Sequence, residues 1–121
     1  MKIRIYYEDT DISGFVYHSN YLKFCERARS ELFFQKGLSP IDGNSHFVVS
    51  KLEAKFIQPA KFGDILEVDT QVTKIGGYSV QLLQTIFRDE VEIFRMDITL
   101  AYLKNGKLAK IDRKTKEIFY K

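Results

Sequence analysis

Carboxylates and a histidine gather in one short segment near the start of the chain. Residues 7–21 hold three acidic side chains together with His18, and they lie between a predicted strand and a predicted helix. The first turn of a helix offers backbone N–H groups without intrahelical partners and the positive end of the helix dipole. Such groups can stabilise the oxyanion of an acyl transfer, while a carboxylate such as Asp11 acts as general base or nucleophile. Acidic residues before a helix also commonly serve only as caps, so the segment alone leaves both interpretations open.

A single long helix is predicted directly after this segment. Apolar residues recur at three- and four-residue steps from about Ser19 to Lys36, which is the spacing of one helical face. Ser19 or Asn20 is the expected N-cap, and Gly37 is expected in the left-handed conformation that ends a helix. Apolar side chains also lie off the main stripe, so we expect a sheet to wrap around this helix.

The remainder of the chain has the alternation of strands. The expected strands cover residues 3–7, 47–57, 65–75, 78–88 and 91–103. Gly76-Gly77 and Asn105-Gly106 are hairpin signals, and Asp112 is expected to cap a short terminal helix that reaches Tyr120. Strands that follow a helix without strict alternation indicate an α+β fold. We therefore predict a five-stranded antiparallel sheet wrapped around one long central helix.

Length and composition fit one soluble domain that covers residues 1–121. The chain is 45% apolar and 29% charged, which is ordinary for a globular protein. Cys25, the only cysteine, lies on the apolar stripe of the helix and is expected in the core. A lone cysteine and the lack of a secretory signal or membrane span predict a cytoplasmic protein.

Charge narrows the range of partners. The net charge is +3, and the basic residues are not clustered with aromatic residues, so a nucleic-acid interface is not expected. Two His and one Cys show no ligand spacing, and no metal or cofactor is expected. The C-terminal part is basic from Lys104 onward. These lysines are either a solvated face or a surface that attracts an anionic ligand, a carrier protein or a membrane.

Two motifs of the chain resemble a known family. The first motif is Tyr7-Glu8-Asp9-Thr10-Asp11, followed by Gly14, Val16-Tyr17-His18, Asn20-Tyr21 and Glu26-Arg27-Ala28-Arg29; the second is Pro59-Ala60-Lys61-Phe62-Gly63-Asp64. Together they resemble the signature of the 4-hydroxybenzoyl-CoA thioesterase branch of hotdog-fold proteins. Within that branch the chain is most similar to the bacterial acyl-CoA thioesterases associated with the Tol-Pal system, the YbgC type. The resemblance covers nearly the whole chain and implies a hotdog fold.

The resemblance also implies roles for individual residues. Asp11 corresponds to the catalytic aspartate, which either activates water or attacks the thioester directly. His18 corresponds to the helix-start position whose backbone N–H polarises the thioester carbonyl. Tyr7 matches a tyrosine often grouped with these two, and its alternative is a strand residue packed in the core. Substrate contacts are expected from Val16, Tyr17, Lys61 and Lys74. Lys74 is the only cation of the hairpin between the predicted third and fourth strands, where relatives often carry several.

The expected activity is hydrolysis of an acyl thioester to a free acid and a thiol. The carrier would be coenzyme A or an acyl carrier protein, and the enzyme would be a homodimer or homotetramer with its site at a subunit interface. Two alternatives are a hydroxyacyl dehydratase and a non-catalytic acyl-carrier-binding scaffold for lipid-synthesis enzymes. The basic tail also leaves peripheral membrane association open.

Overall fold

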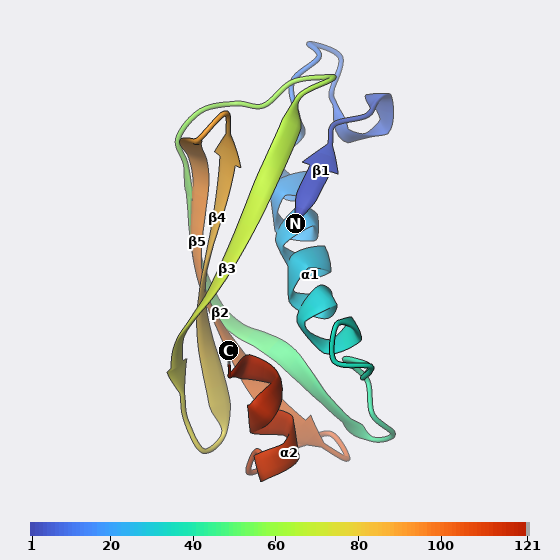
Figure 1. Ribbon diagram of the computed structural model, residues 1–121, viewed down its shortest axis with the longest axis vertical. Coiled ribbons are helices and arrows are strands. Elements are labelled where there is room, and N and C mark those ends of the chain that lie inside the picture. The colour runs from blue at the N-terminus through green and yellow to red at the C-terminus, as the bar shows by residue number, and fades with distance from the viewer. Residues whose placement is uncertain (121) are drawn as a thin grey trace.

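The computed structural model describes residues 1–120 and consists of one curved sheet with one long helix against it (Figure 1). Its elements are β1 (Lys2–Arg4), the 3-10 helix η1 (Tyr7–Asp9), α1 (His18–Phe34), β2 (Ser45–Phe56), β3 (Ile65–Ile75), β4 (Ser79–Arg88), β5 (Val91–Lys104), β6 (Lys107–Leu108), α2 (Arg113–Lys116) and the 3-10 helix η2 (Glu117–Phe119). The predicted α+β class and the predicted sheet around one helix are both confirmed. Within residues 1–120, no helix combines the length and the apolarity needed to cross a membrane.

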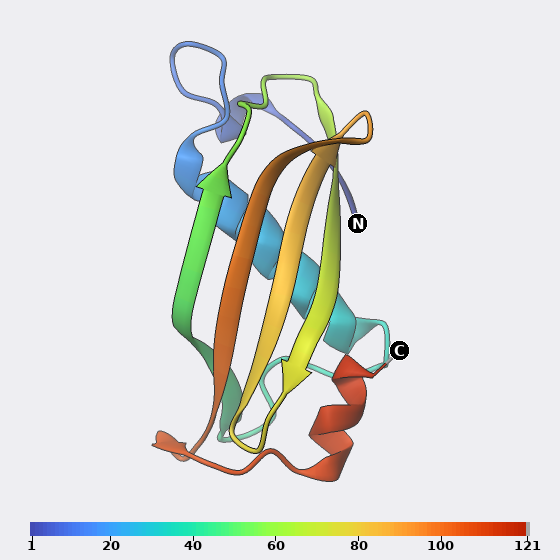
Figure 2. The same ribbon diagram turned by 90° about the vertical axis from the view of Figure 1, so that its left-hand side faces the viewer.

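Every strand pair of the sheet is antiparallel. The strand order is β1-β3-β4-β5-β2, and the two-residue β6 adds to the end of β5. The meander β3–β4–β5 follows the predicted hairpins, and β2 returns along the other side of β5. The sheet therefore has one short edge, the three-residue β1, and one long edge, the twelve-residue β2, which runs along the side of the sheet in Figure 2.

The core lies between α1 and the concave face of the sheet. From α1 it receives Tyr21, Phe24, Cys25, Ala28 and Phe33. The facing strands contribute Leu66, Val68, Val80, Leu82, Ile86, Phe94, Met96 and Ile98. Cys25 is fully buried, as predicted, and burial raises the pKa of its thiol to about 12. Cys25 therefore stays a neutral thiol near pH 7 and packs as an apolar side chain.

The start of α1 differs from the prediction. The helix begins at His18, and Tyr17 occupies the N-cap position without a side-chain cap. The expectation that Ser19 or Asn20 caps the helix is wrong. The Asn20 side chain instead donates to the backbone oxygen of Asp9 at 2.9 Å, so it ties the helix to the loop before it.

The ends of two other elements also differ. The first strand stops at Arg4 instead of Tyr7, because the carboxylate of Asp9 accepts the Tyr6 N–H at 2.9 Å and folds the chain into η1. Asp112 caps α2 as predicted, accepting the Thr115 N–H at 2.8 Å. The terminal α-helix nevertheless ends at Lys116 and continues only as η2.

Candidate active site

The loop that carries Asp11 is a tight turn closed by its own backbone. The Asp11 N–H donates to the Phe15 oxygen at 2.9 Å, and the Gly14 N–H returns to the Asp11 oxygen at 3.0 Å. Gly14 has φ 86°, a left-handed conformation that glycine adopts without steric cost. One turn later Tyr17 donates to the Asp9 oxygen at 3.0 Å, just before α1 begins. The backbone thus fixes Asp11 relative to the helix start.

A second loop, residues 57–64 between β2 and β3, holds the first one in place. Val16 donates its N–H to the Ala60 oxygen at 2.8 Å, and Phe62 donates to the Gly14 oxygen at 3.1 Å. The buried Ala60 N–H in turn donates to the hydroxyl of Tyr21 on α1 at 2.9 Å. These contacts connect both loops and the first turns of the helix into one unit.

Arg88, at the end of β4, fixes the second loop from the side of the sheet. Its guanidinium donates to the Pro59 oxygen at 2.9 Å and forms an ion pair with Asp64 at 3.1 Å. Asp64 also accepts the Lys61 N–H at 3.0 Å. The second motif identified in the sequence is therefore a support for the Asp11 loop.

The Asp11 carboxylate is exposed and held in its ionised form. The Ser13 hydroxyl and the Ser13 N–H, the latter at 2.9 Å, both donate to Oδ1. These bonds, the hydroxyl bond first, lower the pKa of Asp11 below its ordinary value. Among residues 1–120 no donor reaches Oδ2, so this oxygen is free to contact a water molecule or a carbonyl carbon.

His18 supplies the first backbone N–H of α1. Within the described chain, that N–H has no hydrogen-bond acceptor, as expected for the first turn of a helix. The His18 ring lies over Tyr17, with ring centroids 4.5 Å apart, and meets the edge of Phe56 at 6.5 Å. A free N–H with the positive helix end behind it can bind a developing oxyanion.

An apolar pocket opens beside His18. It has a volume of about 290 Å³ and is lined by Val16, His18, Tyr21, Phe56, Ile57, Gln58 and Pro59. Apolar side chains form most of this wall, which suits the methylene groups of an acyl chain or a pantetheine arm. Three other pockets of 230–530 Å³ lie at residues remote from Asp11 and His18.

The structure brings most of the predicted site residues to one end of the molecule. Val16 is buried and helps to form the pocket wall, whereas Tyr17 and Lys61 are exposed and are not among the residues that line the pocket. Tyr7 is 81% exposed on η1, where its ring lies 5.1 Å from that of Phe62. Its alternative role as a core strand residue is therefore wrong.

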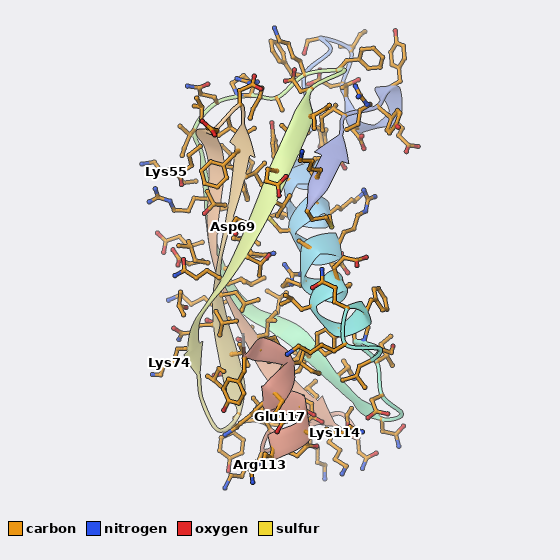
Figure 3. All side chains as sticks on the ribbon, in the orientation of Figure 1. Lys55, Asp69, Lys74, Arg113, Lys114 and Glu117 are labelled. Atoms are coloured by element: carbon orange, nitrogen blue, oxygen red, sulfur yellow. The ribbon has the colours of Figure 1, made fainter. Side chains whose placement is uncertain are left out.

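Lys74 is not brought to this end. It lies near the far end of β3, nine residues beyond Ile65, which is about 30 Å along an extended strand. Figure 3 shows its side chain pointing away from the sheet, near the end that carries α2. Within one protomer Lys74 and Asp11 belong to opposite ends of the molecule.

Sequence reasoning missed Phe56 and Arg88. Phe56 ends β2 and packs against the rings of Tyr21 and Phe94 as well as His18. Its only signal in the sequence is an aromatic residue just before the Gln58-Pro59 stop. Arg88 is the last residue of the predicted strand 78–88, and no local pattern connects it with Asp64, 24 residues earlier. Among residues 1–120, no three His, Cys, Asp or Glu side chains gather closely enough to hold a metal ion.

Comparison with known proteins gives a consistent picture. The model of the Thioesterase superfamily matches residues 13–94. The acyl-CoA thioesterase YbgC of Helicobacter pylori is 47% identical over 87 residues, which are 72% of this chain and 65% of the relative. The match therefore spans slightly less than two thirds of that relative's length. The acyl-CoA thioesterase YbgC of Haemophilus influenzae is 34% identical over 110 residues, 88% of this chain and 81% of the relative.

Solved structures agree on the architecture. The crystal structure of a hypothetical protein from Aquifex aeolicus superposes with a TM-score of 0.93 at 23% identity, over 98% of this chain and 97% of the other. The expected hotdog fold is confirmed. The matched model, the two YbgC relatives and the shared fold together establish that the chain belongs to the thioesterase superfamily.

Proposed function

We propose that this protein is an acyl-CoA thioesterase that hydrolyses an acyl thioester to a free acid and a thiol. The observation that carries the proposal is an ionised, accessible Asp11 on the loop that leads into α1, together with the free N–H of His18 at the start of α1 beside an apolar pocket. The names of the Helicobacter and Haemophilus relatives point to the same activity.

In the proposed reaction the thioester carbonyl oxygen accepts the His18 N–H and the acyl chain enters the pocket next to Phe56. Oδ2 of Asp11 then either removes a proton from the attacking water or attacks the carbonyl carbon to give a mixed anhydride, which water hydrolyses. In both routes the negative charge that develops on the carbonyl oxygen is stabilised by the helix start. In the general-base route the proton that Asp11 takes from water passes to the leaving thiolate. In the anhydride route the thiolate leaves and takes a proton from solvent, and attack by water on the anhydride releases the acid and restores the Asp11 carboxylate.

The test is release of free thiol from acyl-CoA substrates of several chain lengths, followed with a thiol reagent. Wild type should release thiol, and Asp11→Asn should keep the fold and lose nearly all activity, because it removes both base and nucleophile at almost constant shape. An Asp11→Asn variant with most of the wild-type rate would contradict the assignment. Hydration of an enoyl thioester without thiol release would favour the dehydratase, and binding with neither reaction would favour the scaffold.

We also propose that the protein is a homo-oligomer in which β2 pairs with β2 of a second copy. A long unpaired strand edge is an association site, and β2 has no neighbouring strand on one side, where its edge is open beyond Ser45, which bonds to Asp42. Large apolar side chains on this strand are exposed as well, among them Val49, Leu52 and Phe56. Light scattering at micromolar concentration should give at least twice the mass of the 14.2 kDa chain. A monomer mass would refute the pairing.

We further propose that the basic end of the molecule attracts the anionic part of the substrate carrier. Exposed cations gather there, namely Lys104, Lys107, Lys110, Arg113 and Lys114. Figure 3 shows Arg113 and Lys114 on the outer side of α2. An antiparallel β2–β2 pair would bring this end toward the catalytic end of the partner, where coenzyme A, an acyl carrier protein or an anionic membrane that holds the substrate could be captured. A cytoplasmic location, in which acyl-CoA is available, fits the single buried thiol of Cys25.

A further inference from the structure

Arg29 is a half-buried cation without an anion. Its Nη1 donates to Oε1 of Gln84 at 2.9 Å, and within residues 1–120 it forms no ion pair with a carboxylate. Burial lowers the pKa of its guanidinium, but Arg29 remains charged because guanidinium is so strongly basic. A desolvated charge without a partner is costly, and a single copy of the chain gives Arg29 no ion-pair partner among the described residues.

Gln84 holds Arg29 in one position. Gln84 is fully buried in β4, and its amide nitrogen donates to the Cys25 oxygen at 2.8 Å and to Thr70 Oγ1 at 3.0 Å. Both amide protons are used, so the amide oxygen faces Arg29 as the acceptor. The guanidinium is thereby fixed while most of its five N–H groups still lack an acceptor in the described chain.

The cleft that Arg29 enters lies beside the open edge of the sheet. It has a volume of about 170 Å³; Glu26, Arg29 and Ser30 of α1 line one side, and Phe47, Val49 and Leu100 of β2 and β5 line the other. Figure 2 shows α1 crossing the sheet diagonally, so that its first turns lie near β2 and its last turns lie away from it. The start of β2 is covered by aromatic side chains, because Phe47 packs against Phe33 and Phe119. Val49, near the middle of the strand, is exposed, and so is Glu26.

The charge of Glu26 acts on Arg29 and raises its pKa against the larger effect of burial, but the two side chains are not in ion-pair contact within the described chain. The two residues are three positions apart and lie on one face of α1, yet they form no ion pair. In a two-fold dimer every contact occurs twice, with residue i of one copy against residue j of the other and the reverse. Two antiparallel copies of α1 would thus bring each Arg29 to the partner's Glu26 in two identical pairs.

The open strand supports the same symmetry axis. Glu26 and Arg29 share their cleft with Phe47 and Val49, and the middle of the twelve-residue β2 lies immediately beyond Val49. We place the two-fold axis near the middle of β2, at the level of this shared cleft. One such axis would serve both the strand edge and the two charges.

We propose that a second copy of this chain closes the Arg29 cleft, with reciprocal Arg29–Glu26 ion pairs across the two-fold axis of the β2–β2 dimer. The inference rests on the oligomer advanced under the proposed function and assigns the residues that specify it. Each pair would be partly desolvated and would therefore contribute to register and partner choice rather than only to steering. The same contact would complete the apolar wall formed by Phe47, Val49 and Leu100.

The test uses charge reversal and sedimentation velocity at physiological salt. Glu26→Lys alone should set two cations against each other at both contacts, and Arg29→Glu alone should likewise set two carboxylates together twice. Each variant should self-associate at least about tenfold more weakly than wild type, as expected for like charges at an interface. An equimolar mixture of the two variants restores two opposite-charge pairs and should form a heterodimer, seen by native mass spectrometry, with nearly wild-type affinity.

One control variant and one alternative variant complete this test. Lys23→Glu reverses an exposed charge of the same helix outside the cleft and should associate like wild type. If Arg29→Glu fails to fold, the double variant Glu26→Lys/Arg29→Gln replaces it, and removal of the repulsion should recover part of the affinity lost in Glu26→Lys. Further weakening in that double variant would refute the proposal. So would unchanged association of both single variants, or a mixture no tighter than its components.

Three results separate the ion pairs, the β2 pairing and the catalytic assignment from one another. A monomeric wild type would refute the β2 pairing itself, whatever the charges do. A dimeric wild type whose charge variants also dimerise normally would refute only the Arg29–Glu26 pairs. Thiol release by wild type, measured separately, reports on the catalytic assignment alone.

Discussion

Removal of the Tyr21 hydroxyl group should destabilise the two loops that hold Asp11 in place. Tyr21→Phe deletes the oxygen that accepts the Ala60 N–H at 2.9 Å and keeps the ring, which is stacked on Phe94 at 5.3 Å between centroids. Ala60 has no exposed surface, so its N–H would be left without a partner. An unsatisfied buried donor costs about 1–3 kcal/mol. We therefore expect the free energy of unfolding to fall by that amount.

Chemical denaturation with urea measures this change directly. For a domain of this size it corresponds to a melting temperature lower by about 4–12 °C, at about 4 °C per kcal/mol. Since the Ala60 oxygen also accepts the Val16 N–H, the loop with Asp11 should become less ordered, and kcat for thiol release should fall while the pH profile keeps its shape.

Tyr102→Phe is the matched control. Tyr102 is also a buried aromatic residue, packed 4.9 Å from the ring of Phe47, but its hydroxyl makes no hydrogen bond within the described chain. Its loss should change stability by less than about 0.5 kcal/mol. If Tyr21→Phe were as stable as Tyr102→Phe, the hydroxyl of Tyr21 would not be the support that its contacts indicate.

Three further predictions address the site and the core. The Ser13 bonds lower the pKa of Asp11, so kcat/KM should not change as the pH falls until the ordinary carboxylate range is reached. Ser13→Ala removes the hydroxyl bond and should shift the acid limb of the kcat/KM profile to higher pH. An acid limb at the same pH would show that ionisation of Asp11 does not control the rate. Cys25→Ala should lower the free energy of unfolding in urea by about 1–2 kcal/mol and leave kcat near the wild-type value. The native thiol has a pKa of about 12 and should resist alkylation at pH 7, so rapid alkylation with loss of activity would contradict its position in the core. KM for acyl-CoA should rise with ionic strength as the Debye length falls from about 30 Å to 8 Å while kcat stays nearly constant, whereas a flat KM would exclude electrostatic capture of the nucleotide.

The sheet was predictable because its signals are local. β3 occupies residues 65–75 as predicted, since each alternate side chain there faces either the core or the solvent. Asn105-Gly106 turns the chain with both residues at positive φ, as the hairpin signal predicts. Gly76-Gly77 lies in the turn between β3 and β4 as predicted, although neither glycine has a positive φ. These features depend only on residues within one strand or one turn.

The helix start and the support of the site were less predictable because they depend on distant partners. Asn20 looks like a cap, but it bonds to Asp9 eleven residues earlier. Arg88 is recognised as a support only when β4 is seen beside the loop that holds Pro59 and Asp64. The contact between Gln84 and Arg29 likewise depends on how α1 packs against β4, and no pattern within either element reveals that packing.

The way in which the Asp11 loop is held has a practical use. Backbone bonds hold this loop, and the side chain of Ile12 at its tip is fully exposed. A substitution at Ile12 should therefore leave the position of Asp11 unchanged. The native thiol is buried, so Ile12→Cys would introduce a single reactive position to which a fluorescent dye could be coupled. Such a labelled protein would report the arrival of substrate, and of the proposed second subunit, near Asp11 in real time, without any change to the groups that are proposed to perform the reaction.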